Sequence, residues 1–119
     1  MPVRLVTLLA LLALAGCGSA GAPAKATDRH AQITLDDYTI RPQDLSVQSG
    51  KLTLTVKNDG RLGHTFRIRG KTRAVFALTT IRPGESRTRS TKLAPGTYTM
   101  FCALANHEEL GMTGKLHVR

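Results

Sequence analysis

The chain has 119 residues, which leaves room for a single folded domain. Its 17 Lys and Arg residues outnumber its 8 Asp and Glu residues, so the formal net charge at pH 7 is +9. A basic balance of this kind suits nucleic acid, anionic lipid or an acidic protein partner, and basic strand faces that meet only solvent are equally open.

The N-terminal segment is typical of a secretory signal, because Arg4 precedes an apolar run over residues 5–15. The run is well short of the roughly 20 residues that a spanning helix needs. Residues 14–17, Leu-Ala-Gly-Cys, resemble the bacterial lipobox. We therefore expect removal of residues 1–16 and lipid attachment to Cys17, with an ordinary cleaved signal as the alternative. An extracytoplasmic protein anchored to the outer face of the cell membrane is not expected to meet nucleic acid.

Residues 17–30 are small and polar without an apolar period, and we interpret them as a flexible tether. They contain one of the two cysteines of the chain, and Cys102 is the other. If Cys17 carries lipid, Cys102 has no disulfide partner. A lone thiol in an oxidising compartment needs another purpose, and metal ligation is one.

Residues 31–119 alternate apolar and polar side chains with period two, which predicts half-buried strands. In the segment 51–57, for example, Leu52, Leu54 and Val56 share one face. Strands are predicted at Gln32–Leu35, Asp44–Val47, Lys51–Lys57, His64–Arg69, Ala74–Leu78, Ser86–Leu93, Thr97–Cys102 and Lys115–Arg119. Seven or eight short strands separated by Pro-Gly and Asn-Asp-Gly turns indicate an all-β, antiparallel sandwich.

The strand predicted at Ser86–Leu93 reads Ser-Arg-Thr-Arg-Ser-Thr-Lys-Leu and has almost nothing to bury. Charged side chains on a strand discourage pairing with other molecules, so we expect this strand at a sheet edge. The predicted domain has few aromatic residues and no Trp. Because its core is therefore thin, a bound metal ion would add noticeably to the stability of the fold.

The stretch Tyr-Thr-Met-Phe-Cys-Ala-Leu-Ala-Asn-His-Glu-Glu-Leu-Gly-Met places Cys102, His107 and Met112 five residues apart. Cys102 lies at the end of a predicted strand, and the loop after it can return His107 and Met112 to the same point. His64 begins another strand with the parity of the inward Phe66. Taken singly, each could be an ordinary core or rim residue. Together they form the two-imidazole, one-thiolate, weak-thioether set of mononuclear blue copper sites.

Two segments resemble the cupredoxin family of small blue copper proteins. Asn-Asp-Gly-Arg-Leu-Gly-His-Thr-Phe is similar to the family segment that carries the first ligand, and Gly-Thr-Tyr-Thr-Met-Phe-Cys…His…Met-Thr-Gly is similar to the one that carries the other three. The resemblance covers residues 32–119 and implies an eight-stranded Greek-key sandwich with one copper ion buried under one end. Thr65 stands where Asn is frequent in the family, and Ala105-Asn106 replaces a common Pro-Gly.

This reading predicts an electron carrier that cycles between Cu(I) and Cu(II), because the mixed soft and nitrogen donors suit both oxidation states. We expect a fairly high reduction potential, no enzymatic activity, a monomer, and redox partner proteins that are membrane-bound or extracytoplasmic. Electrons would leave through the edge of His107. The apolar patch predicted around it consists of Leu62, Gly63, Leu104, Ala105, Leu110 and Gly111.

Two other functions remain open from the sequence. The same site could serve a copper-binding lipoprotein for storage, delivery or sensing of copper without a shuttle role. The domain could also be an interaction module whose site is empty or holds zinc. His117 alternates outward between Leu116 and Val118 and is not predicted to be a ligand.

Overall fold

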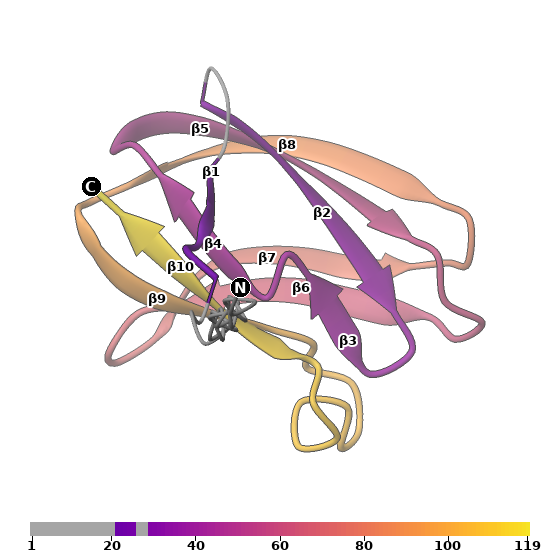
Figure 1. Cartoon of the computed structure of the whole chain (residues 1–119). Helices are drawn as coiled ribbons and strands as arrows, with labels where there is room; N and C mark the ends of the chain where they lie inside the picture. Colours follow the sequence, from indigo (N-terminus) through magenta and orange to yellow (C-terminus); the bar gives the residue numbers. More distant parts are fainter. Residues whose placement is uncertain (1–20, 26–28) are drawn as a thin grey trace, which may run out of the picture.

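A computed structural model describes residues 21–25 and 29–119, and this part of the chain is all-β (Figure 1). Within these residues the strands form two sheets that pack face to face. The structure contains no helix in this range, and so none of the length and apolarity needed to cross a membrane. The predicted signal at residues 1–16 and the predicted lipidation site Cys17 lie outside the described residues.

The larger sheet has the strand order β1-β4-β10-β9-β6-β7 and the smaller sheet the order β3-β2-β5-β8. The strands of the larger sheet are β1 (Ala24–Lys25), β4 (Asp44–Val47), β10 (Thr113–Val118), β9 (Gly96–Phe101), β6 (His64–Arg69) and β7 (Ala74–Ile81). Those of the smaller sheet are β2 (His30–Asp36), β3 (Thr39–Arg41), β5 (Gly50–Asn58) and β8 (Ser86–Leu93).

All eight predicted strands are present, and the expected Greek-key sandwich is confirmed. The short strands β1 and β3 were not predicted, and β1 lies inside the predicted tether at residues 17–30. The expected purely antiparallel pairing was wrong, because β4 pairs in parallel with β10 and with β1, and β2 pairs in parallel with β5. Parallel neighbours arise because the chain repeatedly crosses from one sheet to the other between strands.

The core lies between the sheets and follows the predicted alternation. In β5, Leu52, Leu54 and Val56 are almost completely buried, whereas the residues between them are partly exposed. In β6 the alternation breaks, because His64, Thr65 and Phe66 are all buried. The register of the β6–β7 pair shifts between His64 and Phe66, and the Thr65 hydroxyl contacts Cys102 and Ala103 of the segment after β9.

The charged strand β8 lies at the edge of the smaller sheet, as predicted. Its arginines reach across to β7, the edge strand of the other sheet. Arg87 Nη1 donates to Thr79 Oγ1 at 2.8 Å, and Arg89 Nη1 donates to the Ala77 carbonyl at 2.9 Å. These contacts occupy groups on the β7 edge that could otherwise pair with another chain.

Three connections meet at one end of the sandwich, which we call the metal end. They are the β2–β3 turn (residues 37–38), the β5–β6 loop (59–63) and the β9–β10 loop (102–112). Hydrogen bonds join the first two, and His107 of the third contacts Tyr38 of the first and His64, which directly follows the second. Figure 1 shows the long β9–β10 loop projecting beyond the strands at this end.

Candidate metal centre

The structure brings His64, Cys102 and His107 together at the metal end. The Nδ1 atoms of the two imidazoles lie 3.2 Å apart, and the Cys102 Sγ lies 3.7 Å from His107 Nδ1. All three ligand atoms lie within 4.8 Å of one another. His64 and Cys102 are buried, while His107 is half-buried. One side chain therefore comes from the start of β6 and two from the β9–β10 loop, 43 residues away in the case of His107.

The β9–β10 loop is held by its own backbone hydrogen bonds. The His107 N–H donates to the Leu104 carbonyl, and the Met112 N–H donates to the His107 carbonyl, both at 3.0 Å. The Cys102 N–H then donates to the Met112 carbonyl at 3.2 Å, which closes the loop. The backbone at Ala105 adopts a φ of 42°. The loop thus forms tight successive turns without the Pro-Gly that is common in the resembling family.

Met112 is completely buried, and its backbone forms hydrogen bonds with the backbone of both Cys102 and His107. The backbone therefore presents Met112 next to the three clustered residues. Its buried thioether would match the weak axial ligand of blue copper sites. The role of Met112 as a ligand stays a prediction.

Asp37 orients His64, and the sequence analysis missed it. The His64 Nε2 lies 2.9 Å from Asp37 Oδ1, and because a carboxylate can only accept, Nε2 carries the hydrogen. That leaves the Nδ1 lone pair of His64 directed at His107 and available to a metal ion. The Arg61 N–H and then the His64 imidazole hold the pKa of the Asp37 carboxyl below its usual value. Asp37 is 27 residues from His64, and no spacing rule in the sequence connects them.

The β5–β6 loop wraps closely around Asp37. The N–H groups of Arg61 and Leu62 donate to its carboxylate at 3.0 and 3.2 Å. Gly60 permits this approach, because a Cβ at that position would lie 2.4 Å from Asp37 Oδ1. Asn58 secures the loop from the other side, since its Nδ2 donates to the Leu62 carbonyl at 2.8 Å.

Thr65 provides the hydrogen bond to the cysteine sulfur. Its Oγ1 donates to Cys102 Sγ at 3.6 Å and accepts from the Ala103 N–H at 2.8 Å. A donor to the sulfur stabilises thiolate charge and is one of the features that tune the potential of blue copper sites. Thr65 therefore supplies this contact even though Asn is the frequent residue at this position in the resembling family.

Large apolar side chains are exposed in the loops of the metal end. Leu62 is 42% exposed and Leu110 is 52% exposed. Tyr38, which the sequence analysis did not include, is 37% exposed and meets the His107 ring edge-on with a centroid distance of 5.3 Å. The other residues of the predicted patch are partly or fully exposed and lie in the β5–β6 and β9–β10 loops: Gly63, Leu104, Ala105 and Gly111.

Glu108 forms an ion pair with Arg69. The Arg69 guanidinium also lies 4.3 Å from the centroid of the Phe101 ring. This pairing raises the pKa of Arg69. The neighbouring Glu109 forms no ion pair with any basic side chain in the described part of the chain.

The remaining described histidines lie outside the cluster. His30 bonds to Thr55 Oγ1 at 2.8 Å, and His117 pairs with Asp44 at 2.6 Å on the exposed surface. Both serve as natural comparisons for the clustered histidines, because they share the ring but have no sulfur or second imidazole among their contacts.

The three clustered side chains fit one metal ion of blue copper type. Metal–nitrogen bonds of about 2.0–2.1 Å and a metal–sulfur bond of about 2.3 Å can span the observed separations of ring nitrogens and sulfur. Two imidazoles and one thiolate are the donors that copper prefers in such sites. Copper is therefore the cofactor that the cluster of His64, Cys102 and His107 fits.

Known structures share this fold. Dithionite-reduced auracyanin from Roseiflexus castenholzii is 22% identical, covering 79% of this chain and 99% of its own, with a TM-score of 0.71. Rusticyanin from Thiobacillus ferrooxidans is 16% identical over 86% of this chain and 85% of its own, with a TM-score of 0.67. A multicopper oxidase is 24% identical over 85% of this chain and 47% of its own, with a TM-score of 0.61. No curated protein sequence matches the chain.

The model of the cupredoxin-like domain matches residues 5–118, which is nearly the whole sequence. Together with the two-sheet architecture and the clustered imidazoles and thiol, this match shows that the chain belongs to the cupredoxin-like domain family.

Proposed function

We propose that the protein is a membrane-anchored, extracytoplasmic electron carrier that cycles one copper ion between Cu(I) and Cu(II). The observation that carries this proposal is the cluster of His64, Cys102 and His107 within 4.8 Å. Membership of the cupredoxin-like family supports a carrier over an enzyme. Lipid attachment at Cys17 would hold the carrier at the outer face of the cell membrane.

Copper would supply the one-electron redox change, and the surrounding residues make that change easy. Burial of His64 and Cys102 excludes water, so little solvent has to reorganise. Asp37 holds His64 in one orientation, and Thr65 donates to the sulfur. Because these contacts are already made before copper binds, the ligands would need little rearrangement when its oxidation state changes, and this would favour fast electron transfer.

Electrons would leave through His107. Both of its contacts within the cluster are made by Nδ1, so the opposite edge of the ring faces outward. Leu62, Leu110 and Tyr38 provide exposed apolar surface near that edge. A small apolar contact without charge pairing suits brief docking of a redox partner.

A copper titration followed by visible spectroscopy tests the proposal. Cu(II) added to the protein should produce an intense thiolate-to-copper charge-transfer band. The variants Cys102→Ala and His107→Ala should lose the band, whereas the matched variant His117→Ala should retain it. A weak spectrum typical of nitrogen and oxygen ligands in the unaltered protein would refute the blue copper site.

A role in copper storage, delivery or sensing is the second candidate. It is favoured by the partial exposure of His107, which gives an acceptor protein access to one side of the site. A carrier should keep its copper through repeated reduction and oxidation in the presence of a mild Cu(I) chelator. Loss of copper to the chelator within one reduced interval would favour the copper-handling function.

A further inference from the structure

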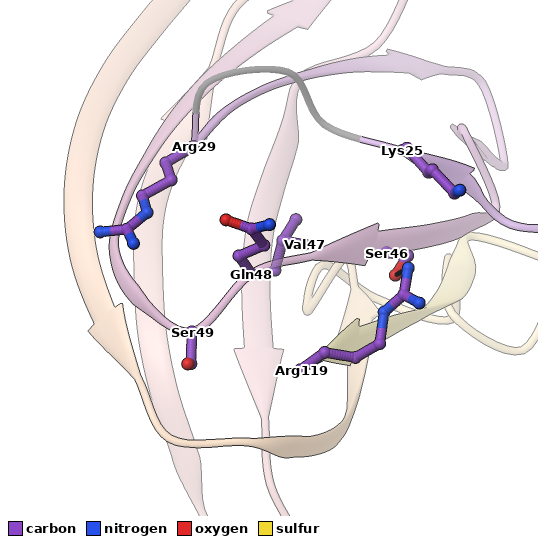
Figure 2. A pocket seen from close by; sticks show the side chains of 7 residues that line it. All are labelled: Lys25, Arg29, Ser46, Val47, Gln48, Ser49 and Arg119. Atoms are coloured by element: carbon purple, nitrogen blue, oxygen red, sulfur yellow. Dashed lines mark hydrogen bonds between the residues drawn. The ribbon is translucent and has the colours of Figure 1, made fainter.

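A hollow at the end of the sandwich opposite the metal end is lined by basic side chains. Its volume is about 950 Å³, and Lys25, Arg29 and Arg119 line it together with Ser46, Val47, Gln48 and Ser49. Figure 2 shows Lys25 and Arg29 on opposite sides of the hollow, with Arg119 directed toward Ser46. None of these lining residues is acidic.

Two lysines extend this basic region along the smaller sheet. The Arg29 guanidinium lies beside Gly50, where a Cβ would be 3.2 Å from its Nη1. Lys51 follows Gly50 and stands directly opposite Lys92 in the β5–β8 pair. Like charges opposite one another destabilise a strand pair, and an anion bound across them would remove that repulsion. We call Lys25, Arg29, Lys51, Lys92 and Arg119 the distal basic surface.

Acidic residues are concentrated at the other end of the molecule. Six of the eight belong to the turns and strand ends at the metal end: Asp36, Asp37, Asp59, Glu85, Glu108 and Glu109. Asp44 begins β4 and pairs with His117, and Asp28 lies outside the described residues. Because these acidic residues offset the basic residues of the metal end, an anionic surface should attract the distal end more strongly.

The residues just before β1 also lie near distal residues. Ala22 and Pro23 line a second hollow, of about 530 Å³, which shares Lys25 and Arg119 with the first. The predicted lipidation site Cys17 lies five residues before Ala22. Five residues span at most about 18 Å even when fully extended, so a lipid at Cys17 would hold the distal end close to the membrane.

We propose that the distal basic surface binds the anionic phospholipid headgroups of the membrane. The inference deepens the proposed carrier function by naming the surface on which the carrier rests, and the charges act whether or not Cys17 carries lipid. Strand β5, with nine residues, separates the two ends by roughly 30 Å. His107 and its apolar patch would therefore face away from the membrane, toward partners in the extracytoplasmic space.

Vesicle co-sedimentation tests this orientation. The copper-loaded chain from residue 17 to 119, with Cys17→Ser to exclude acylation and disulfide formation, is mixed with phosphatidylcholine vesicles with or without phosphatidylglycerol. A distal variant carries Lys25→Gln, Arg29→Gln and Lys51→Gln. A matched variant carries Arg41→Gln, Lys57→Gln and Arg82→Gln, which lower the net charge equally at the metal end.

Binding should require phosphatidylglycerol and decline with added salt, because exposed charges are screened. Each basic residue near an anionic membrane contributes about fivefold, so the distal variant should bind roughly a hundredfold more weakly at low salt. The matched variant should bind as the unaltered protein does. Both variants should keep the charge-transfer band. The band would show that they are folded and that any loss of vesicle binding does not come from damage to the copper site.

Three results would overturn the proposal. Absence of binding to anionic vesicles is the first. An equal loss in the distal and matched variants is the second, because net charge alone would then explain binding. Binding to soluble polyglutamate but not to vesicles is the third, and it would assign the surface to an acidic protein partner. If vesicle binding follows expectation while the copper band is absent, only the proposed carrier function fails.

Discussion

Thr65 links the strand β6 to the cysteine loop, and its hydroxyl can be removed almost without changing shape. Thr65 is 5% exposed, and its Oγ1 accepts from the Ala103 N–H and donates to Cys102 Sγ. The variant Thr65→Val replaces the hydroxyl by a methyl group of similar size. The variant Thr65→Ser keeps the hydroxyl and serves as the control.

Thr65→Val should destabilise the metal-free protein. The Ala103 N–H loses its acceptor, and an unsatisfied buried donor is destabilising by about 1–3 kcal/mol. Because Ala103 is itself exposed, water can partly replace the lost acceptor. We therefore expect a decrease of about 1 kcal/mol in the free energy of unfolding, at the lower end of that range.

The same substitution should lower the reduction potential of the copper-loaded protein. The sulfur carries more negative charge in the Cu(I) state, so a donor to it stabilises the reduced form more than the oxidised form. Cys102 is 1% exposed, and water cannot take the place of the hydroxyl. The sulfur contact is long at 3.6 Å, so we expect a difference of about 1 kcal/mol, or roughly 40 mV for one electron.

Urea unfolding of the metal-free variants measures the first effect, and a redox titration followed at the charge-transfer band measures the second. Thr65→Ser should stay close to the unaltered protein in both. If Thr65→Val has an unchanged unfolding free energy and an unchanged potential, the two hydrogen bonds of Thr65 do not act as described. A potential that rises instead of falling would refute the sign of the sulfur effect.

Gly60→Ala should lower the free energy of unfolding by about 1–3 kcal/mol and weaken copper binding, because its Cβ would meet the Asp37 carboxylate. The control Gly70→Ala, where a Cβ would make ordinary contacts, should have smaller effects in both urea unfolding and copper titration. Met112→Leu should change stability by less than about 1.5 kcal/mol and raise the potential, since loss of a weak donor disfavours Cu(II). The Asp37 pKa lies below its ordinary 3.8, so its stabilising effect is present above that pH and declines as pH falls. In Asp37→Asn, the free energy of unfolding measured in urea should therefore fall less steeply between about pH 5 and pH 2.5. An unchanged pH dependence would contradict this.

Much of the site could be predicted because the donor types are unusual and their order along the chain is informative. Cys102, His107 and Met112 lie within one loop, and local spacing alone brings them near one another. His64 could be added because strand parity places it with the inward Phe66. The structure brings His64, Cys102 and His107 together, and it buries Met112 beside them.

Asp37 and Tyr38 could not be found in this way. Both lie in the β2–β3 turn, and β3 was not predicted, so nothing placed this turn near His64 or His107. The hydrogen bond from Thr65 to the sulfur could not be foreseen either, because it depends on a register shift in β6 and on contacts with the segment after β9. Each miss concerns a contact between segments that only the order of strands in the sheets brings together.

The strands and the chemistry of the donors could be derived from local properties, namely alternation with period two and the identity of each side chain. The residues that support those donors, and the positions of the charged clusters, depend on contacts between distant segments. The parallel pairing of β4 with β10 and of β2 with β5 depends on how the chain crosses between sheets. That crossing places the turn at Asp37 against His64 and brings Arg29, Lys51 and Lys92 together at the opposite end. Both arrangements depend on strand topology and not on spacing along the chain, so the sequence pattern does not reveal them.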